Sequence, residues 1–196
     1  MNPRKQFAAI VAALFITVAS TQAQVYTAVL SGPAESPPNA SPGTGFAQIT
    51  LNLAMHTFTV QVNFTGLTGT TTASHIHAAT AVPGVGTAGV ATQTPSFSGF
   101  PLGVTSGSYL NTFDMLMLGT WNPNYVTANG GTAMGAETAF VSAIQNGTAY
   151  FNIHTSTFAG GEIRGFFAPV PEPATTSLLV VATAGLLLAV RRRRRA

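Results

Sequence analysis

The sequence contains no cysteine and very few charged residues. Of its 196 residues only 7% are charged, whereas 46% are hydrophobic. The absence of cysteine excludes a disulfide-stapled small domain, a thiolate zinc site and a cysteine nucleophile. The length allows one domain of ordinary size with tails at its ends.

Basic residues are almost missing from the body of the chain. Between residues 24 and 168 the single base is Arg164, and the net charge of this stretch is −3. A weakly acidic body repels a phosphate backbone, so we expect no nucleic-acid partner. Its few scattered carboxylates and the absence of a Gly-x-Ser-x-Gly element indicate a protein that is not an enzyme. The four carboxylates belong to Glu35, Asp114, Glu137 and Glu162.

The N-terminus has the pattern of an export signal. Arg4 and Lys5 precede an uncharged apolar run over residues 7–19, which is too short to cross a bilayer. Small residues then lead to Ala23, after which signal peptidase is expected to cut. The sequence therefore predicts a signal peptide over residues 1–23, with a buried N-terminal helix as the alternative.

The C-terminus combines an uncharged segment with a basic end. Residues 174–190 carry no charge, and arginines follow at 191–195. As a helix this segment is about 25 Å long, enough to cross a thin bilayer, and the arginines should stay in the cytoplasm. We therefore expect a transmembrane helix that holds the protein transiently in the inner membrane, with the body outside the cytoplasm.

Pro171, Glu172 and Pro173 stand directly before this segment. Pro-Glu-Pro, one apolar span and a basic terminus, in this order, resemble the PEP-CTERM sorting signal of Gram-negative bacteria. The resemblance implies that residues 169–196 are a sorting signal, processed by an exosortase-type transpeptidase. It also implies release to the cell surface or into an extracellular polysaccharide matrix. A permanent single-pass anchor is the alternative.

The body of the chain has the hydrophobic alternation of β-strands. Apolar residues alternate with polar ones over residues 47–53 and again over 58–64, which predicts an antiparallel hairpin. Helical spacing over residues 135–144 predicts one short helix. We expect an all-β domain over residues 24–168, an antiparallel β-sandwich or Greek-key barrel with that helix. Further strands are expected at residues 25–30, 73–78, 148–155 and 162–167.

Three blocks of this body resemble the CHRD, or chordin-type, domain family. The first is residues 26–32 with the turn at 35–38, and the second is residues 74–79 with a His-Ile-His element. The third is residues 147–155, continued by residues 160–165. The resemblance implies an all-β extracellular domain without an established catalytic activity.

Three histidines could form a metal site. In a strand, His75 and His77 leave the same face about 6.5–7 Å apart, while Ile76 points into the core. His154 stands on the outward face of another predicted strand. If these strands are neighbours, three imidazoles converge in a geometry suited to Zn²⁺ or Cu²⁺. The His-x-His pair is also similar in geometry to that of Cu/Zn superoxide dismutase, which makes a redox enzyme of that type a more remote alternative.

A structural network explains the same residues without any ligand. Glu162 and Arg164 are two positions apart on one strand face and suit a partly buried ion pair that could join the three histidines. Such a network requires every buried member to be satisfied. His56, in the predicted hairpin turn, is expected to be solvated.

The surface chemistry favours a binding or structural role. A body rich in Thr, Asn and Gly, with little charge, offers many hydrogen-bond partners to a hydroxylated polymer such as an exopolysaccharide. We therefore expect a non-enzymatic protein of the cell surface or extracellular matrix that requires no cofactor. The alternative is an extracytoplasmic protein that binds Cu or Zn.

Overall fold

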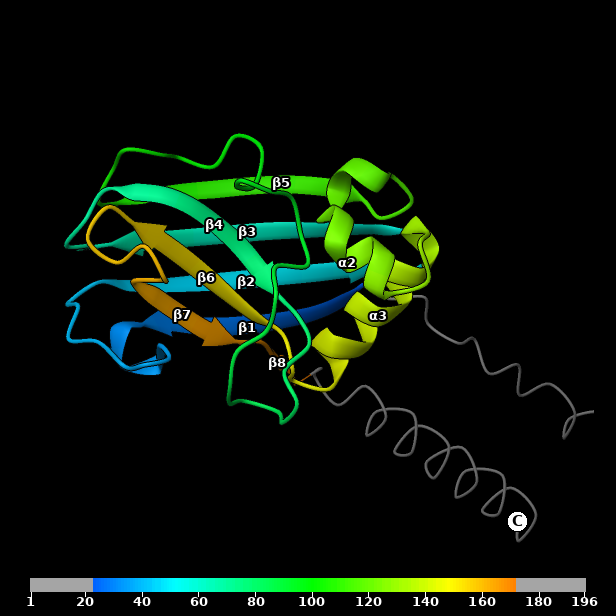
Figure 1. Ribbon diagram of the computed structural model, residues 1–196, viewed down its shortest axis with the longest axis horizontal. Helices are drawn as coiled ribbons and strands as arrows, with labels where there is room; N and C mark the ends of the chain where they lie inside the picture. The colour runs from blue at the N-terminus through cyan, green and yellow to red at the C-terminus, as the bar shows by residue number, and fades with distance from the viewer. Residues whose placement is uncertain (1–22, 172–196) are drawn as a thin grey trace, which may run out of the picture.

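The computed structural model describes residues 23–171 of the chain (Figure 1). Ala23 and Pro171 are its first and last residues. The rest of the predicted signal peptide, Glu172 and Pro173, the predicted transmembrane segment and the arginine tail lie outside these residues. Within residues 23–171 no helix has the length and apolar character needed to cross a membrane.

An antiparallel eight-stranded sheet forms the body of the molecule. Its order is β4-β6-β7-β1-β2-β3-β5, and β8 pairs with β1 beside this path. The sheet is curled, so that β4, β6 and β7 lie across β1, β2, β3 and β5 (Figure 1). The strands are β1 (Gln24–Ser31), β2 (Thr44–Asn52), β3 (Thr57–Thr65), β4 (Thr71–His77), β5 (Gly107–Asp114), β6 (Tyr150–Thr155), β7 (Ile163–Phe166) and β8 (Ala168–Pro169).

The curl divides the sheet into two parts. We call β4, β6 and β7 the three-stranded half, and β1, β2, β3 and β5 the four-stranded half. The join is short, because β7 pairs with β1 through Ser31 and Arg164. Gly165 makes the close approach possible, since a Cβ atom there would lie 2.2 Å from the carbonyl oxygen of Val29.

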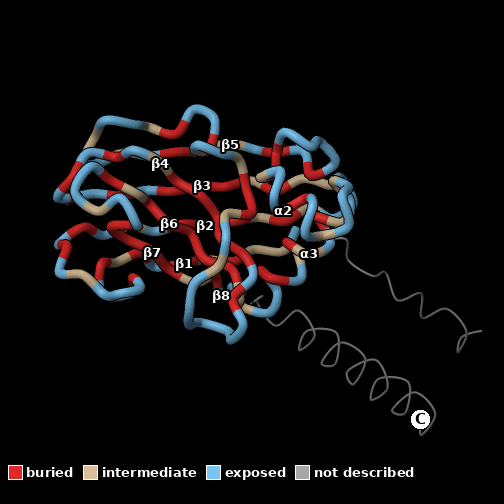
Figure 2. The backbone as a smooth tube through the Cα atoms, viewed as in Figure 1, coloured by how far each residue is buried: buried red, intermediate tan, exposed pale blue. Residues whose placement is uncertain are grey.

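The core lies between the two halves. In the predicted hairpin, β2 pairs with β3 in a register that sets Ile49 opposite Val60 and Leu51 opposite Phe58. All four side chains are completely buried, as the alternation of the sequence requires. Figure 2 shows the strands largely buried and the connecting loops exposed.

Helices close one end of the curled sheet (Figure 1). The helix predicted over residues 135–144 is confirmed as α3 (Ala133–Gln145), which begins after Thr132, whose side chain accepts a hydrogen bond from the backbone of Gly135. Phe140 of α3 packs against Phe58 and Trp121, with ring centroids 5.2 Å apart in both pairs. The shorter α2 (Pro123–Ala128) lies beside it, and the 3₁₀ turns are η2 (Gly32–Ala34) and η3 (Leu118–Thr120).

The antiparallel β architecture is confirmed, but strands β5 and β8 and helix α2 were not predicted. Strand β5 was not predicted because its alternation of apolar and polar residues is broken. Tyr109 and Phe113 are buried, whereas Asn111 takes the inward position between them. Leu110, on the opposite face, is 68% exposed. Helix α2 was not predicted because its six residues are too few for a helical period to be recognised.

Candidate metal centre

Strands β4 and β6 bring the three histidines together. The two strands pair antiparallel, with His75 opposite Asn152, His77 opposite Tyr150, and Ala73 opposite His154. The alternation of side chains places all three imidazoles on the outer face of the three-stranded half. Ile76 points the other way and is fully buried in the core. The expected convergence of the three rings is therefore present.

Each imidazole is oriented by a hydrogen bond to a backbone carbonyl. Nε2 of His75 lies 2.7 Å from the oxygen of Pro95, and Nδ1 of His77 lies 2.9 Å from that of Ala88. Nδ1 of His154 lies 2.9 Å from the oxygen of Ala159. Because a carbonyl can only accept, these nitrogens must carry the protons. The tautomer of each neutral ring is thereby fixed.

The opposite nitrogens of the three rings carry the lone pairs. They are Nδ1 of His75, Nε2 of His77 and Nε2 of His154, each buried and without a hydrogen-bond partner among the described residues. The ligand atoms that the three rings offer lie within 4.8 Å of one another. Three converging acceptors with no donor between them match the ligand set of a divalent metal ion.

The surroundings keep these rings neutral. Burial lowers the pKa of both His75 and His77 from 6.5 to about 4. Burial lowers the pKa of His154 as well. A neutral imidazole is the form that binds a metal ion, so no deprotonation step is needed near neutral pH.

A stack of side chains supports His77 from β6 and β7. The ring of Tyr150 lies parallel to that of His77, with centroids 4.8 Å apart. The guanidinium of Arg164 lies 4.8 Å from the centre of the Tyr150 ring and donates from NH1 to the carbonyl of Gly86. This stack therefore joins the centre to the glycine-rich loop that also supplies Ala88.

The predicted ion pair between Glu162 and Arg164 is wrong. Nε of Arg164 lies 3.7 Å from a carboxylate oxygen of Glu35 instead, and the same Nε donates to the carbonyl of Ala34. The carboxylate of Glu162 accepts hydrogen bonds from the hydroxyls of Ser41 and Thr155 and from the backbone N–H groups of Thr68 and Gly69. Burial alone would raise the pKa of Glu162, but these four hydrogen bonds bring it below its usual value. Glu162 and Arg164, although only two positions apart, thus belong to separate hydrogen-bonding clusters.

Comparison with known families identifies the domain. The model of the CHRD domain family matches residues 26–167. The chain belongs to the CHRD domain family. No curated protein and no solved structure gave a significant match to it.

Two buried polar residues of this CHRD domain were not predicted from the sequence. They are Glu35, the acidic partner of Arg164, and Asn152, which lies opposite His75. Glu35 and Asn152 are 6% and 3% exposed, and one oxygen of each is buried without a hydrogen-bond partner in the described part of the chain. Gly161, with φ at 133°, packs so closely that a Cβ atom would lie 2.6 Å from the Asn152 amide and 2.7 Å from Glu35. The sequence signal was only that the single base of the domain suits a partner carboxylate, and it does not distinguish Glu35 from Glu162.

His56 is placed differently from expectation. It lies in the β2–β3 turn with φ at 51°, and its Nδ1 lies 2.9 Å from the carboxylate of Glu137 on α3. The side chain is 42% exposed. It is therefore tied to the helix rather than only solvated, and it takes no part in the cluster of His75, His77 and His154.

Proposed function

We propose that this CHRD domain is an exported metal-binding domain that holds Zn²⁺ or Cu²⁺ through His75, His77 and His154. The supporting observation is the set of three buried ring nitrogens without partners, on rings whose ligand atoms lie within 4.8 Å of one another. The backbone carbonyls that accept hydrogen bonds from the other ring nitrogens orient the rings, as hydrogen-bond partners of metal-binding histidines ordinarily do.

The unpartnered nitrogens favour this function over the structural network. A network without a ligand requires every buried member to be satisfied, and each acceptor left unpaired costs about 1–3 kcal/mol. A metal ion satisfies all three acceptors at once. Nitrogens that bind zinc tetrahedrally at about 2.0–2.1 Å lie about 3.3–3.4 Å apart, so binding requires only a small inward movement of the rings.

The donor set limits the choice of metal. Three neutral imidazoles suit Zn²⁺ and Cu²⁺, whereas Mg²⁺ and Ca²⁺ take oxygen ligands. Three protein ligands also leave one position of a tetrahedral ion open to water or another small ligand. The function would therefore be to capture or hold a late transition metal outside the cytoplasm.

The test is metal binding by the full chain, purified in detergent and stripped with a chelator. Zn²⁺ and Cu²⁺ are titrated separately by calorimetry at pH 7, and the bound metal is counted by mass spectrometry. We expect one ion per chain. Loss of a group that only hydrogen-bonds to a metal ligand costs about 10- to 100-fold in metal affinity, so loss of a ligand itself in His77→Ala or His154→Ala should cost at least 100-fold.

His56→Ala is the matched control, because it removes a histidine that lies outside the centre. It should leave the stoichiometry at one ion per chain. Electron paramagnetic resonance of the Cu²⁺ form should show coupling to three nitrogens, which fall to two in His154→Ala. Absence of bound metal, or binding that only the His56 variant abolishes, would refute the function.

Export and sorting complete the proposal. Arg4 and Lys5 with the apolar run after them, and Pro171, Glu172 and Pro173 with the basic end, support secretion and processing by signal peptidase and an exosortase-type enzyme. The mature protein would stand at the cell surface or in the exopolysaccharide matrix. Mass spectrometry of the extracellular form should show cleavage after Ala23 and loss of residues beyond the Pro-Glu-Pro region. An extracellular protein that keeps its arginine tail would contradict the sorting.

A further inference from the structure

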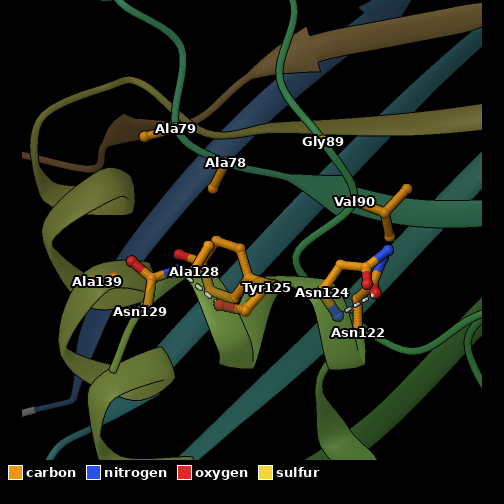
Figure 3. A pocket seen from close by; sticks show the side chains of 10 residues that line it. All are labelled: Ala78, Ala79, Gly89, Val90, Asn122, Asn124, Tyr125, Ala128, Asn129 and Ala139. Carbon is orange, nitrogen blue, oxygen red and sulfur yellow. Dashed lines mark hydrogen bonds between the residues drawn. The ribbon is translucent and has the colours of Figure 1, made fainter. Parts of the chain in front are cut away.

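A second candidate site lies beside the metal centre. A cavity of about 550 Å³ opens between the segment that follows β4 and helix α2 (Figure 3). This volume is in the range of about 300–1,000 Å³ that small-molecule sites occupy. Its wall includes Ala78, the residue after His77, and Gly89, the residue after Ala88. The cavity and the metal centre therefore share two chain segments.

The lining of this cavity carries no charge. All of the residues around it are Ala, Gly, Val, Asn or Tyr. A phosphate or carboxylate ligand would find no basic partner there, and a cation would find no carboxylate. The ligand that fits is therefore uncharged.

The polar groups of the lining have capacity to spare. Asn122 accepts a hydrogen bond from the backbone of Asn124 at 2.9 Å, and Asn129 donates to the carbonyl of Tyr125 at 2.8 Å. Each of these bonds uses one end of an amide and leaves the other end for a ligand. Figure 3 shows the Tyr125 ring between Asn129 on one side and Asn122 with Asn124 on the other. Burial raises the pKa of the Tyr125 hydroxyl, which remains a neutral donor and acceptor.

We propose that this cavity binds one unit of a neutral saccharide. Sugar hydroxyls donate and accept hydrogen bonds, as the asparagine amides require, and the C–H face of a sugar ring can pack against Tyr125 and Val90. A hydrocarbon ligand would leave the amides without partners. An extended peptide is recognised through a free strand edge or a helix groove, whereas this lining presents side-chain amides from a loop and a helix. The site does not depend on the metal.

The experiment uses the full chain in a sugar-free zwitterionic detergent, with and without Zn²⁺. The probes are the methyl glycosides of glucose, galactose, mannose and N-acetylglucosamine, and neutral oligosaccharides released from the producing cells' exopolysaccharide. Saturation-transfer NMR detects contact, and calorimetry gives the Kd. At least one probe should bind, and Asn124→Leu should weaken it about 10-fold, the typical effect of one lost hydrogen bond.

Two further variants distinguish a lost contact from a lost fold. Tyr125→Phe keeps the aromatic ring against Trp121, with ring centroids 6.2 Å apart. Because it removes the hydroxyl, it should also weaken sugar binding. Asn63→Leu makes the same change as Asn124→Leu on the exposed face of β3 and should have no effect. The proposal is overturned if no probe binds, if Asn124→Leu and Tyr125→Phe leave binding unchanged, or if acetyl-triglycine amide binds in place of every sugar.

Discussion

The two halves of the sheet treat their outer faces in opposite ways. On the four-stranded half, Val29 and Leu110 are 75% and 68% exposed although both are apolar. On the three-stranded half, loops cover the outer face, and His75, Asn152 and Arg164 are 6%, 3% and 5% exposed although all are polar. Apolar side chains thus stand in solvent on one half while polar side chains are buried on the other.

This inversion sets the face that carries the proposed metal site apart from the other half of the sheet. An exposed apolar side chain costs little, but a buried polar group is costly unless it is fully bonded. Buried polar atoms without a partner among the described residues lie on three imidazoles, Ser74 and Asn152 of the three-stranded half, and on Glu35 in the turn after β1. Folding alone would be served better by an apolar layer there, and the proposed metal ion would satisfy the three imidazoles of this set.

Acid should reveal the difference most strongly. Above pH 6.5 the imidazoles are neutral in both the folded and the unfolded chain. As the pH falls towards 4, the unfolded chain binds protons at His75 and His77 while the folded rings, with a pKa of about 4, do not. The chelator-treated protein should therefore lose up to about 3 kcal/mol of unfolding free energy for each ring over this window.

Glu35 changes the unfolding free energy in the opposite direction as the pH falls. Burial raises its pKa to about 7, against the charge of Arg164, so the folded carboxyl binds its proton before the unfolded one as the pH falls. It therefore offsets part of the loss between pH 7 and 4.5. Urea titrations at pH 7, 5.5 and 4 measure the net effect. His77→Leu should flatten the pH dependence, and an unchanged slope in that variant would contradict neutral burial of the ring.

The join between the halves should be the next most sensitive point. Gly165→Ala places a methyl group 2.2 Å from the carbonyl oxygen of Val29 and forces β7 away from β1. We expect a loss of about 3 kcal/mol, at the upper end of the cost of overpacking. Thermal and urea unfolding measure it. Gly119→Ala, with no atom within 4 Å of its added methyl, is the control and should change stability by less than about 0.5 kcal/mol.

The same contrast explains which parts of the fold could be predicted. In β2 and β3 one face is buried and the other exposed, so a period of two is visible and both strands were predicted within a few residues. In β6 five of the six residues are buried. The sequence therefore predicted that Tyr150 and Asn152 lie on the outward face, but not that this face is buried. The strand order was not accessible, because the pairing of β7 with β1 depends on a join of one residue pair.

The three histidines of the candidate site were predicted from the sequence, but the groups that hold them in place were not. The His-x-His spacing fixes two rings on one face, and the third follows if β4 and β6 are neighbours, as they are. The carbonyls of Pro95, Ala88 and Ala159 come from irregular loops whose course no periodicity encodes. The pairing of Arg164 with Glu35 joins residues 129 positions apart, so only the closed fold brings them together.

The smallest effect is expected on the outer face of the four-stranded half. Leu110→Thr replaces an exposed apolar side chain with a β-branched polar one and should change the unfolding free energy by no more than about 0.5 kcal/mol. Metal affinity should stay the same, because Leu110 is exposed on the outer face of the four-stranded half and takes no part in the cluster of His75, His77 and His154. A loss above about 1 kcal/mol would mean that this face is covered in solution, for example by a second copy of the chain. Sedimentation of the wild type and the variant would then differ, and the contrast between the halves would reflect an interface instead of a functional layer.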